Sequence, residues 1–395
     1  MKFQAVWHAL AATKITLTVS LAFLLGIAIE QVGRLELDAE IRYIGTFDHP
    51  NTFRCARQLP DGFEQPFQLD PFLVKPHKTV EQQTLPNLSE LVWPEEVVAP
   101  RPADRINLTE GLQPEMREPF KPVMSKGQMA VSRRLLQVFS DLMFEHGYGD
   151  RFWLQGGTLV GSYHFHDFIP WDDDVDVLAD AELRPEIQRL LKTLEPDYQW
   201  YEMVERDKLF TKPINSSQSH LDLEYSRYTA DKPWAWPFMD IGYYQVGPTH
   251  TCESTWRLSR GVCIPNSVIF PLIYRPFGKQ WYPTPSNVPV YLRSLYREHS
   301  SCVTFGYSHI LEGGSQVARV PCHTLADQYA FMRHVPVPNA MMVSINNSLS
   351  TMFMVDLEQL VKKSENGWDV IHELRLPIQL VKVNDLDGYG IPEQR

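Results

Sequence analysis

Two things are scarce in this 395-residue sequence, positive charge and cysteine. Its 37 lysines and arginines are outnumbered by 48 aspartates and glutamates, which gives a formal net charge of −11. A protein that binds nucleic acid through phosphate contacts needs the opposite balance, so no nucleic acid partner is expected. Five cysteines are too few for a disulfide-dense scaffold. With 44% hydrophobic residues, wholesale disorder is excluded, and the length allows two or three domains.

Proline, by contrast, is abundant and unevenly placed. The chain has 30 prolines, about 8% against a usual ~5%. Twelve of them fall between Pro50 and Pro122, where few periodic apolar runs occur. This composition predicts that residues 33–125 form an extended, semi-rigid luminal stem or a loosely packed subdomain.

The N-terminus carries a membrane-directed segment. Residues 15–29 contain no charged side chain. Spanning about 30 Å of hydrocarbon takes roughly 20 residues, which is reached if Lys14 snorkels toward the interface. Acidic residues dominate beyond the segment, so the positive-inside rule predicts a cytoplasmic tail and a signal anchor over residues 1–32 of a single-pass type II membrane protein. The alternative is a cleaved signal peptide, with a small-residue cleavage site from Gly26 to Ala28.

Both alternatives place residues 31–395 in a secretory lumen or outside the cell. Asn-x-Ser/Thr sequons in this part of the chain are then candidate glycosylation sites. Four such sequons occur, at Asn87, Asn107, Asn215 and Asn346.

The same compartment favours disulfide bonds. We expect the pairs Cys252–Cys263 and Cys302–Cys322, while Cys55 lies in the predicted stem. The alternative is a structural zinc site that uses some of these cysteines with His250 or His323, although no Cys-x₂-Cys spacing supports it.

The region after residue 125 has the pattern of a folded domain. Apolar residues recur at helical spacing from Val131 to Met143, and Gly147 ends the run. Further predicted elements are a strand at 152–154, a helix from Gly156, a helix within 183–194, and extended segments near 199–204, 221–228 and 239–246. Because helices and strands interleave, the predicted fold class is α/β or α+β.

An acid-rich strand carries the strongest chemical signal. Alternation along a strand places Asp174 and Asp176 on one face. Two carboxylates so close repel each other unless a divalent cation lies between them, and hard oxygen ligands favour Mg²⁺ or Mn²⁺. Asp240 is a lone acid in an apolar strand, and its unpaired burial would be costly. The pattern therefore predicts that Asp240 shares a metal site with the other two acids.

A glycine pair precedes these acids in the sequence. Gly156, Gly157 and Thr158 lie at the start of the predicted helix. Backbone N–H groups and the positive end of the helix dipole can bind a phosphate there. A plain turn is the commoner explanation of a glycine pair, but its position before the acids favours contact with donor phosphates.

From Gly156 to Val177 the sequence reads GGTLVGSYHFHDFIPWDDDVDV. This stretch resembles the signature of the LicD/fukutin family, in which a G-T-L-x-G element precedes an I-P-W-D-D-D-x-D element. The resemblance implies a nucleotidyltransferase-like mixed sheet flanked by helices. It also implies that Asp174, Asp176 and Asp240 are the catalytic, metal-binding acids and that Asp172 is a further acid of the metal site.

The resemblance covers roughly residues 127–300. A segment from Pro271 to Tyr296 is similar to the closing element of the family. We therefore expect a catalytic domain over residues 126–300 and a C-terminal extension of unknown role over 301–395. Where the family often has a basic residue after the glycine element, this sequence has His164 and His166.

The resemblance also implies an activity. Known members transfer phosphocholine from a CDP donor to cell-surface glycans, or ribitol phosphate from CDP-ribitol to a protein-linked glycan in the Golgi. The hypothesis is a phosphotransferase that uses Mg²⁺ or Mn²⁺ to move a phosphoryl-linked alditol, choline or similar group from a CDP-type donor to a hydroxyl of a protein or lipid glycan. Arg275 or Lys279 would be a further phosphate partner. The expected location is the Golgi or endoplasmic reticulum membrane, with a luminal catalytic domain, or outside the cell if the N-terminal segment is cleaved.

Two other functions fit the same residues. A non-catalytic luminal protein would keep the fold and bind a glycan or assist a related transferase, although clustered carboxylates are costly to retain without a metal ion. A glycosyltransferase with an Asp-x-Asp metal site would instead transfer a sugar without phosphate.

Overall fold

The computed structural model describes residues 67–103, 118–254, 262–296, 301–337 and 353–379, except for gaps at 205, 215, 219, 229–231 and 305. These residues belong to a compact unit that extends from Pro66 to Arg395. The predicted anchor and Cys55 lie outside the described residues. Within the described ranges, no helix is long and apolar enough to cross a membrane. Asn87 is the one predicted sequon asparagine among them, and its side chain is exposed.

A mixed sheet with the strand order β1-β2-β7-β4-β3 forms the centre of the fold. β2 and β7 run parallel, whereas β1 is antiparallel to β2 and β4 is antiparallel to β7. β2 and most of β7 are buried, as expected for central strands of a sheet covered on both faces. The strands are β1 (Phe152–Leu154), β2 (Val175–Asp180), β7 (Phe238–Val246), β4 (Asp207–Thr211) and β3 (Tyr198–Glu202), with β8 (His250–Glu253) and β9 (Cys263–Pro265) continuing from β7.

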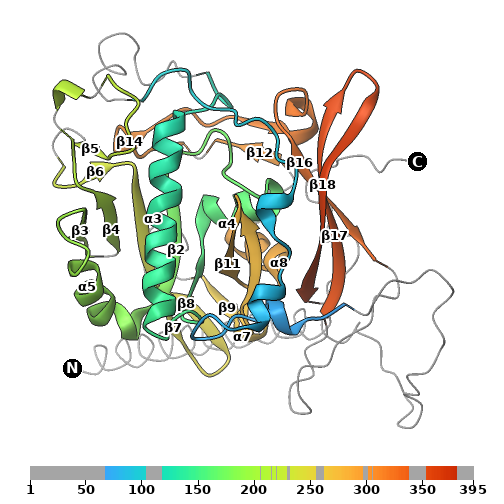
Figure 1. Ribbon diagram of the computed structural model, residues 1–395, viewed down its shortest axis with the longest axis horizontal. Helices are drawn as coiled ribbons and strands as arrows, with labels where there is room; N and C mark the ends of the chain where they lie inside the picture. Colours follow the sequence, from blue (N-terminus) through green and yellow to red (C-terminus); the bar gives the residue numbers. More distant parts are fainter. Residues whose placement is uncertain are drawn as a thin grey trace, which may run out of the picture. The chain divides into compact units, whose positions relative to one another are not determined.

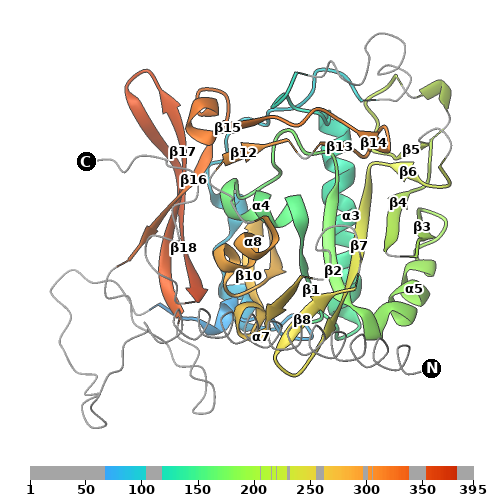
Figure 2. The same ribbon diagram turned by 180° about the vertical axis from the view of Figure 1, so that it is seen from behind.

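Helices cover both faces of this sheet. α3 (Lys126–Glu145) begins with a capping box between Ser125 and Gln128 and packs against β4 and β7. Figure 1 shows α3 in front of these strands. α8 (Val288–Tyr296) lies on the reverse side in Figure 2, where the Trp153 indole N–H donates to the Tyr291 hydroxyl at 3.1 Å. The predicted mixed sheet flanked by helices is confirmed.

Smaller elements complete the described chain. The predicted helix within 183–194 is α5 (Arg184–Lys192), whereas the segment predicted to be extended near 221–228 contains only the two-residue strand β5 (Arg227–Tyr228). The other helical elements are α4 (Gly156–His164), α7 (Asn266–Ile269), η1 (Asp70–Phe72), η2 (Glu81–Thr84), η3 (Leu88–Glu90), η5 (Ala181–Leu183), η6 (Ser216–Gln218) and η7 (Cys322–Leu325). The other strands are β6 (Ala235–Trp236), β10 (Ile273–Phe277), β11 (Gln280–Thr284), β12 (Ser301–Val303), β13 (Tyr307–Ser308), β14 (Gly313–Gly314), β15 (Arg319–Pro321), β16 (Phe331–Pro336), β17 (Phe353–Ser364) and β18 (Gly367–Gln379).

Part of the predicted stem is packed into the folded unit. Phe72 and Leu88 are buried in a cluster with Leu374 and Leu376, and Leu73 forms a β-bridge with Ile273 of β10. Residues 67–103 are therefore not an extended spacer, which corrects the stem prediction for this range. Short 3₁₀ helices bury one or two residues each without a repeating apolar period, so the sequence pattern gave no sign of this packing.

The predicted C-terminal extension is likewise part of the main domain. β16, β17 and β18 form an antiparallel sheet whose residues Phe331, Val361 and Ile378 belong to the main hydrophobic core. β16 contacts α4. Figure 1 shows the β16–β18 sheet (orange to red) to the right of α4. The boundary expected at residue 300 therefore does not separate two hydrophobic cores, because described residues on both sides of it share one core.

Disulfide bonds join the two expected cysteine pairs. Cys252 and Cys263 link β8 to β9, and Cys302 and Cys322 link β12 to the start of η7. A zinc site needs free thiolates. The pairing therefore excludes these four cysteines from the alternative zinc site.

Arg275 has a structural role instead of the expected contact with donor phosphate. Its side chain is 0% exposed, and its Nη2 lies 2.6 Å from Glu358 Oε2. The guanidinium also lies over the Tyr163 ring, 5.0 Å from the centroid. Because this cation is buried against a carboxylate of β17, we correct the prediction that Arg275 binds the donor.

The Arg275–Glu358 pair is the centre of a buried ionic network. His166, which follows α4, places its Nε2 2.7 Å from Glu358 Oε2. His334 of β16 places Nδ1 2.6 Å from Asp356 Oδ2. Burial alone would raise the pKa of Glu358, but Arg275 and His334 outweigh burial and hold this pKa below its usual value. The network joins the α4 region to the C-terminal sheet.

The Phe72→Ala substitution tests the packing of the 67–103 segment. It should lower the free energy of unfolding by about 3 to 5 kcal/mol, because it leaves a cavity between η1 and the C-terminal sheet. Urea denaturation followed by circular dichroism measures this change. Val80→Ala is the control, since Val80 is 74% exposed. Equal, small effects of both substitutions would show that this segment is not part of the cooperative unit.

The Glu358→Gln substitution tests the buried network. It should lower the free energy of unfolding by about 3 to 5 kcal/mol, because it leaves the Arg275 guanidinium uncompensated in the interior. Glu186→Gln removes one partner of an exposed ion pair with Arg189 and should leave the denaturation midpoint almost unchanged. A stable Glu358→Gln variant would mean that the network is not needed to hold the C-terminal sheet.

Candidate metal and phosphate site

The predicted acids meet at one end of the two parallel central strands. Asp176 on β2 is directly opposite Asp240 on β7 in the strand register, and Asp174 immediately precedes β2. Oxygen atoms of these three carboxylates lie within 4.8 Å of one another. Asp172 and Asp173 lie in the loop that leads into β2, and all five acids are buried.

The glycine pair at the start of α4 faces these acids. A Cβ atom on Gly156 would meet the Asp176 carboxylate, and one on Gly157 would meet the Asp172 carboxylate. Gly156 also has a φ of +59°, a conformation that glycine adopts without strain. Thr158 Oγ1 accepts a hydrogen bond from the Asp176 backbone N–H at 2.8 Å. The sequence at this turn therefore allows the acids to approach the N-terminus of α4.

Two cations that the sequence pattern did not reveal pair with Asp240. Lys208 Nζ lies 2.7 Å from Oδ1, and Arg206 Nη1 lies 2.8 Å from Oδ2. Lys208 is on β4, which is antiparallel to β7 and brings it opposite Asp240, and Arg206 immediately precedes β4. Burial would raise the pKa of Asp240, but Lys208 and Arg206 outweigh burial and lower this pKa to about 2. The premise that Asp240 is buried without a partner is therefore wrong.

Asp172 and Asp176 are buried beside other carboxylates. Burial, followed by the charge of Asp174, raises the pKa of Asp172 and of Asp176 well above the usual value. A divalent cation bound by these oxygens would relieve the repulsion. The oxygen-rich donor set fits Mg²⁺ or Mn²⁺.

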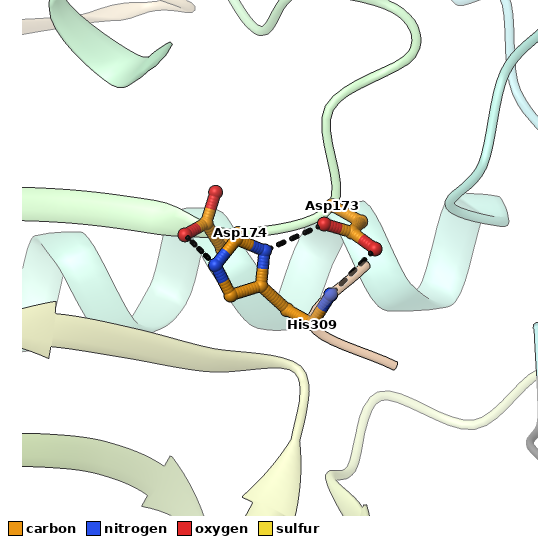
Figure 3. Close-up of side chains that lie close together, drawn as sticks. All are labelled: Asp173, Asp174 and His309. Atoms are coloured by element: carbon orange, nitrogen blue, oxygen red, sulfur yellow. Dashed lines mark hydrogen bonds and ion pairs between the residues drawn. The ribbon is translucent and has the colours of Figure 1, made fainter. Parts of the chain in front are cut away.

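A histidine from the C-terminal region also reaches the acids. His309 follows β13, and its ring lies between two carboxylates: Nδ1 is 2.8 Å from Asp173 Oδ1, and Nε2 is 3.0 Å from Asp174 Oδ2 (Figure 3). Its backbone N–H also donates to Asp173 Oδ2 at 3.1 Å. Burial would lower the pKa of His309, but Asp174 and Asp173 outweigh burial and raise this pKa well above the usual value.

Lys279, the other predicted phosphate partner, lies away from the acid cluster. Lys279 lines a cavity of about 810 Å³ between α3, the 165–170 loop and the β10–β11 turn, which none of the five acids lines. Trp171 packs against Phe120 at 5.1 Å between ring centroids, and its indole N–H donates to the Val303 carbonyl. This packing gives Trp171 a structural role.

The parallel β2–β7 pair, its facing acids and the glycine turn define a nucleotidyltransferase-type domain. Residues 149–287 match the family model described as LicD/FKTN/FKRP, nucleotidyltransferase domain. The match supports the resemblance of this part of the chain to the LicD/fukutin family.

Two curated relatives are similar to the same part of the chain. Ribitol 5-phosphate transferase FKRP from Homo sapiens is 29% identical over 146 residues, which cover 35% of this chain and 26% of that protein. The Mus musculus protein of the same name is 28% identical over 146 residues, with the same coverage. The chain therefore matches about a quarter of the length of these relatives.

The Gly156→Ala substitution tests the close approach of the acids to α4. The added Cβ should displace the Asp176 carboxylate and strain the backbone at positive φ. Mn²⁺ affinity, measured by calorimetric titration, should fall at least about tenfold, as it does when groups that orient metal ligands are changed. Gly314→Ala is the control, because its added Cβ meets no atom closer than 4.0 Å. Unchanged Mn²⁺ affinity in Gly156→Ala would contradict the proposed ligand arrangement.

Proposed function

We propose that the protein is a metal-dependent phosphotransferase. It would transfer a phosphoryl-linked alditol, choline or similar group from a CDP-type donor to a glycan hydroxyl. The observation that carries the proposal is the convergence of Asp174, Asp176 and Asp240 beside the N-terminus of α4. The LicD/fukutin domain and the ribitol 5-phosphate transferases similar to it support this reaction class.

The acids would hold the metal ion, with Asp174, Asp176 and Asp240 as ligands and Asp172 adjacent to them. When bound, Mg²⁺ or Mn²⁺ neutralises charge on the donor diphosphate. Both oxygens of Asp240 accept hydrogen bonds from cations. This engagement favours a role for Asp240 as an ionised ligand and disfavours a role as the acceptor of the hydroxyl proton.

The donor phosphates would lie between α4 and β4. Gly156, Gly157 and Thr158 would offer the N-terminal end of α4 to them. Arg206 would supply positive charge from the other side, since its Nη1 lies 3.9 Å from Asp176 Oδ1 as well as 2.8 Å from Asp240 Oδ2. In this arrangement Arg206 takes the role that the sequence had suggested for Arg275.

We also propose a luminal location in the Golgi or endoplasmic reticulum, with residues 15–29 as a type II signal anchor. The disulfide bonds Cys252–Cys263 and Cys302–Cys322 support an oxidising compartment. The exposed Asn87 sequon is compatible with glycosylation there.

The proposed reaction is tested with a donor panel. The purified protein is given CDP-ribitol, CDP-glycerol, CDP-choline and sugar nucleotides with Mn²⁺ or Mg²⁺, and released CMP or CDP is measured. Release of CMP from one CDP-linked donor is expected, because the phosphoryl group moves with the alditol or choline. Asp174→Asn and Asp176→Asn should each reduce turnover at least about a thousandfold, because they remove charge that stabilises the transition state.

Asp369→Asn is the matched control for these substitutions, since Asp369 is an exposed acid on β18. Release of a nucleoside diphosphate from a sugar nucleotide would instead support the glycosyltransferase alternative. Equal turnover by wild type and both site variants would refute the enzyme proposal.

A further inference from the structure

His309 is held in one ring orientation by Asp173. The Asp173 carboxylate accepts hydrogen bonds from three donors of the 308–309 segment: the His309 ring at Nδ1, the His309 backbone N–H and the Ser308 hydroxyl at 3.2 Å. A carboxylate that accepts a hydrogen from one imidazole nitrogen is the usual orienting partner of a metal-ligating histidine. Asp173 thus directs the opposite nitrogen, Nε2, toward Asp174.

The contact between His309 Nε2 and Asp174 Oδ2 places a ring nitrogen beside a carboxylate oxygen. When Nδ1 carries the hydrogen, the neutral ring has a lone pair on Nε2, which faces a carboxylate oxygen 3.0 Å away. These two electron-rich atoms repel each other unless a second ring proton or a metal ion lies at the contact. Adjacent ligands of an octahedral ion with bonds of about 2.1 Å are separated by about 3.0 Å. The observed separation of 3.0 Å fits two neighbouring metal ligands, as it also fits a hydrogen bond from a protonated ring.

Asp174 joins this contact to the proposed metal site. One carboxylate oxygen of Asp174 lies within 4.8 Å of ligand atoms of Asp176 and Asp240, and another such group consists of Asp173, Asp174 and His309. Asp174 is the residue that the two groups share. His309 lies outside residues 149–287, which match the family model.

We propose that His309 Nε2 is a ligand of the catalytic metal ion and that Asp173 is its positioning residue. This inference rests on the metal-dependent function proposed above. Metal binding replaces the Nε2 proton, which leaves to solvent, and forms a nitrogen–metal bond in its place. Imidazole nitrogen suits transition metals, whereas Mg²⁺ prefers oxygen, so His309 biases the site toward Mn²⁺.

The nitrogen ligand is tested by pulsed electron paramagnetic resonance of Mn²⁺ bound to the full chain. Wild-type protein should show electron spin echo modulation from one directly coordinated ¹⁴N nucleus. Selective ¹⁵N labelling of histidine should change this modulation, which tests the ligand without any substitution. His309→Gln should abolish the modulation and weaken Mn²⁺ binding at least about tenfold, with a smaller effect on Mg²⁺.

Two further variants separate ligation from a general structural effect. Asp173→Asn should retain the nitrogen modulation but weaken Mn²⁺ binding, since it disturbs only the orientation of the ring. His323→Gln, at an exposed histidine, should change neither property. Bound Mn²⁺ without histidine modulation in the wild type would overturn the role of His309 and leave the proposed function standing. Failure of the wild type to bind Mn²⁺ or Mg²⁺ would overturn both proposals.

Discussion

Five buried carboxylates at one end of β2 and β7 impose the strongest constraint on this domain. Buried charges of one sign repel each other and lose the solvation of water, so the surrounding elements must supply positive charge. Lys208 of β4 and Arg206, which immediately precedes this strand, supply it, and this requires β4 to pair with β7 in the observed register. The glycine turn at α4 brings the positive end of a helix dipole to the same acids. The sheet order and the helix position thus serve one electrostatic requirement.

The same requirement makes the C-terminal region part of the site. His309 lies between Asp173 and Asp174, although it is far from both in sequence. The buried pair of Arg275 and Glu358 ties β10 to β17, and His166 extends this contact to the end of α4. The folding unit is therefore larger than residues 149–287, which match the family model. A fragment limited to the matched residues would lack His309 and Glu358.

Local patterns predicted the features that depend on local sequence. Helical periodicity located α3, and the acid run with its glycine pair located β2 and α4. The meeting of Asp174, Asp176 and Asp240 followed from strand alternation together with the family resemblance. Arg206 and His309 were missed because their contacts depend on non-local strand pairing and on a distant loop. Arg275 was misassigned because a sequence shows the charge of a side chain but not its burial.

The disulfide between Cys302 and Cys322 connects the proposed luminal location to the geometry of the site. It closes a loop with a sequence separation of 20 residues, and His309 lies within this loop. A cross-link that closes a loop of this size stabilises the folded state by about 3 kcal/mol, because it reduces the conformational entropy of the unfolded chain. It also limits the arrangements of the segment that presents the histidine. In a reducing compartment this restriction would be lost, and the ordering of His309 would depend on its non-covalent contacts, including those with Asp173, Asp174 and Phe238. The disulfide that closes this loop therefore supports the proposed luminal location. The membrane topology predicted from the N-terminal sequence supports the same location.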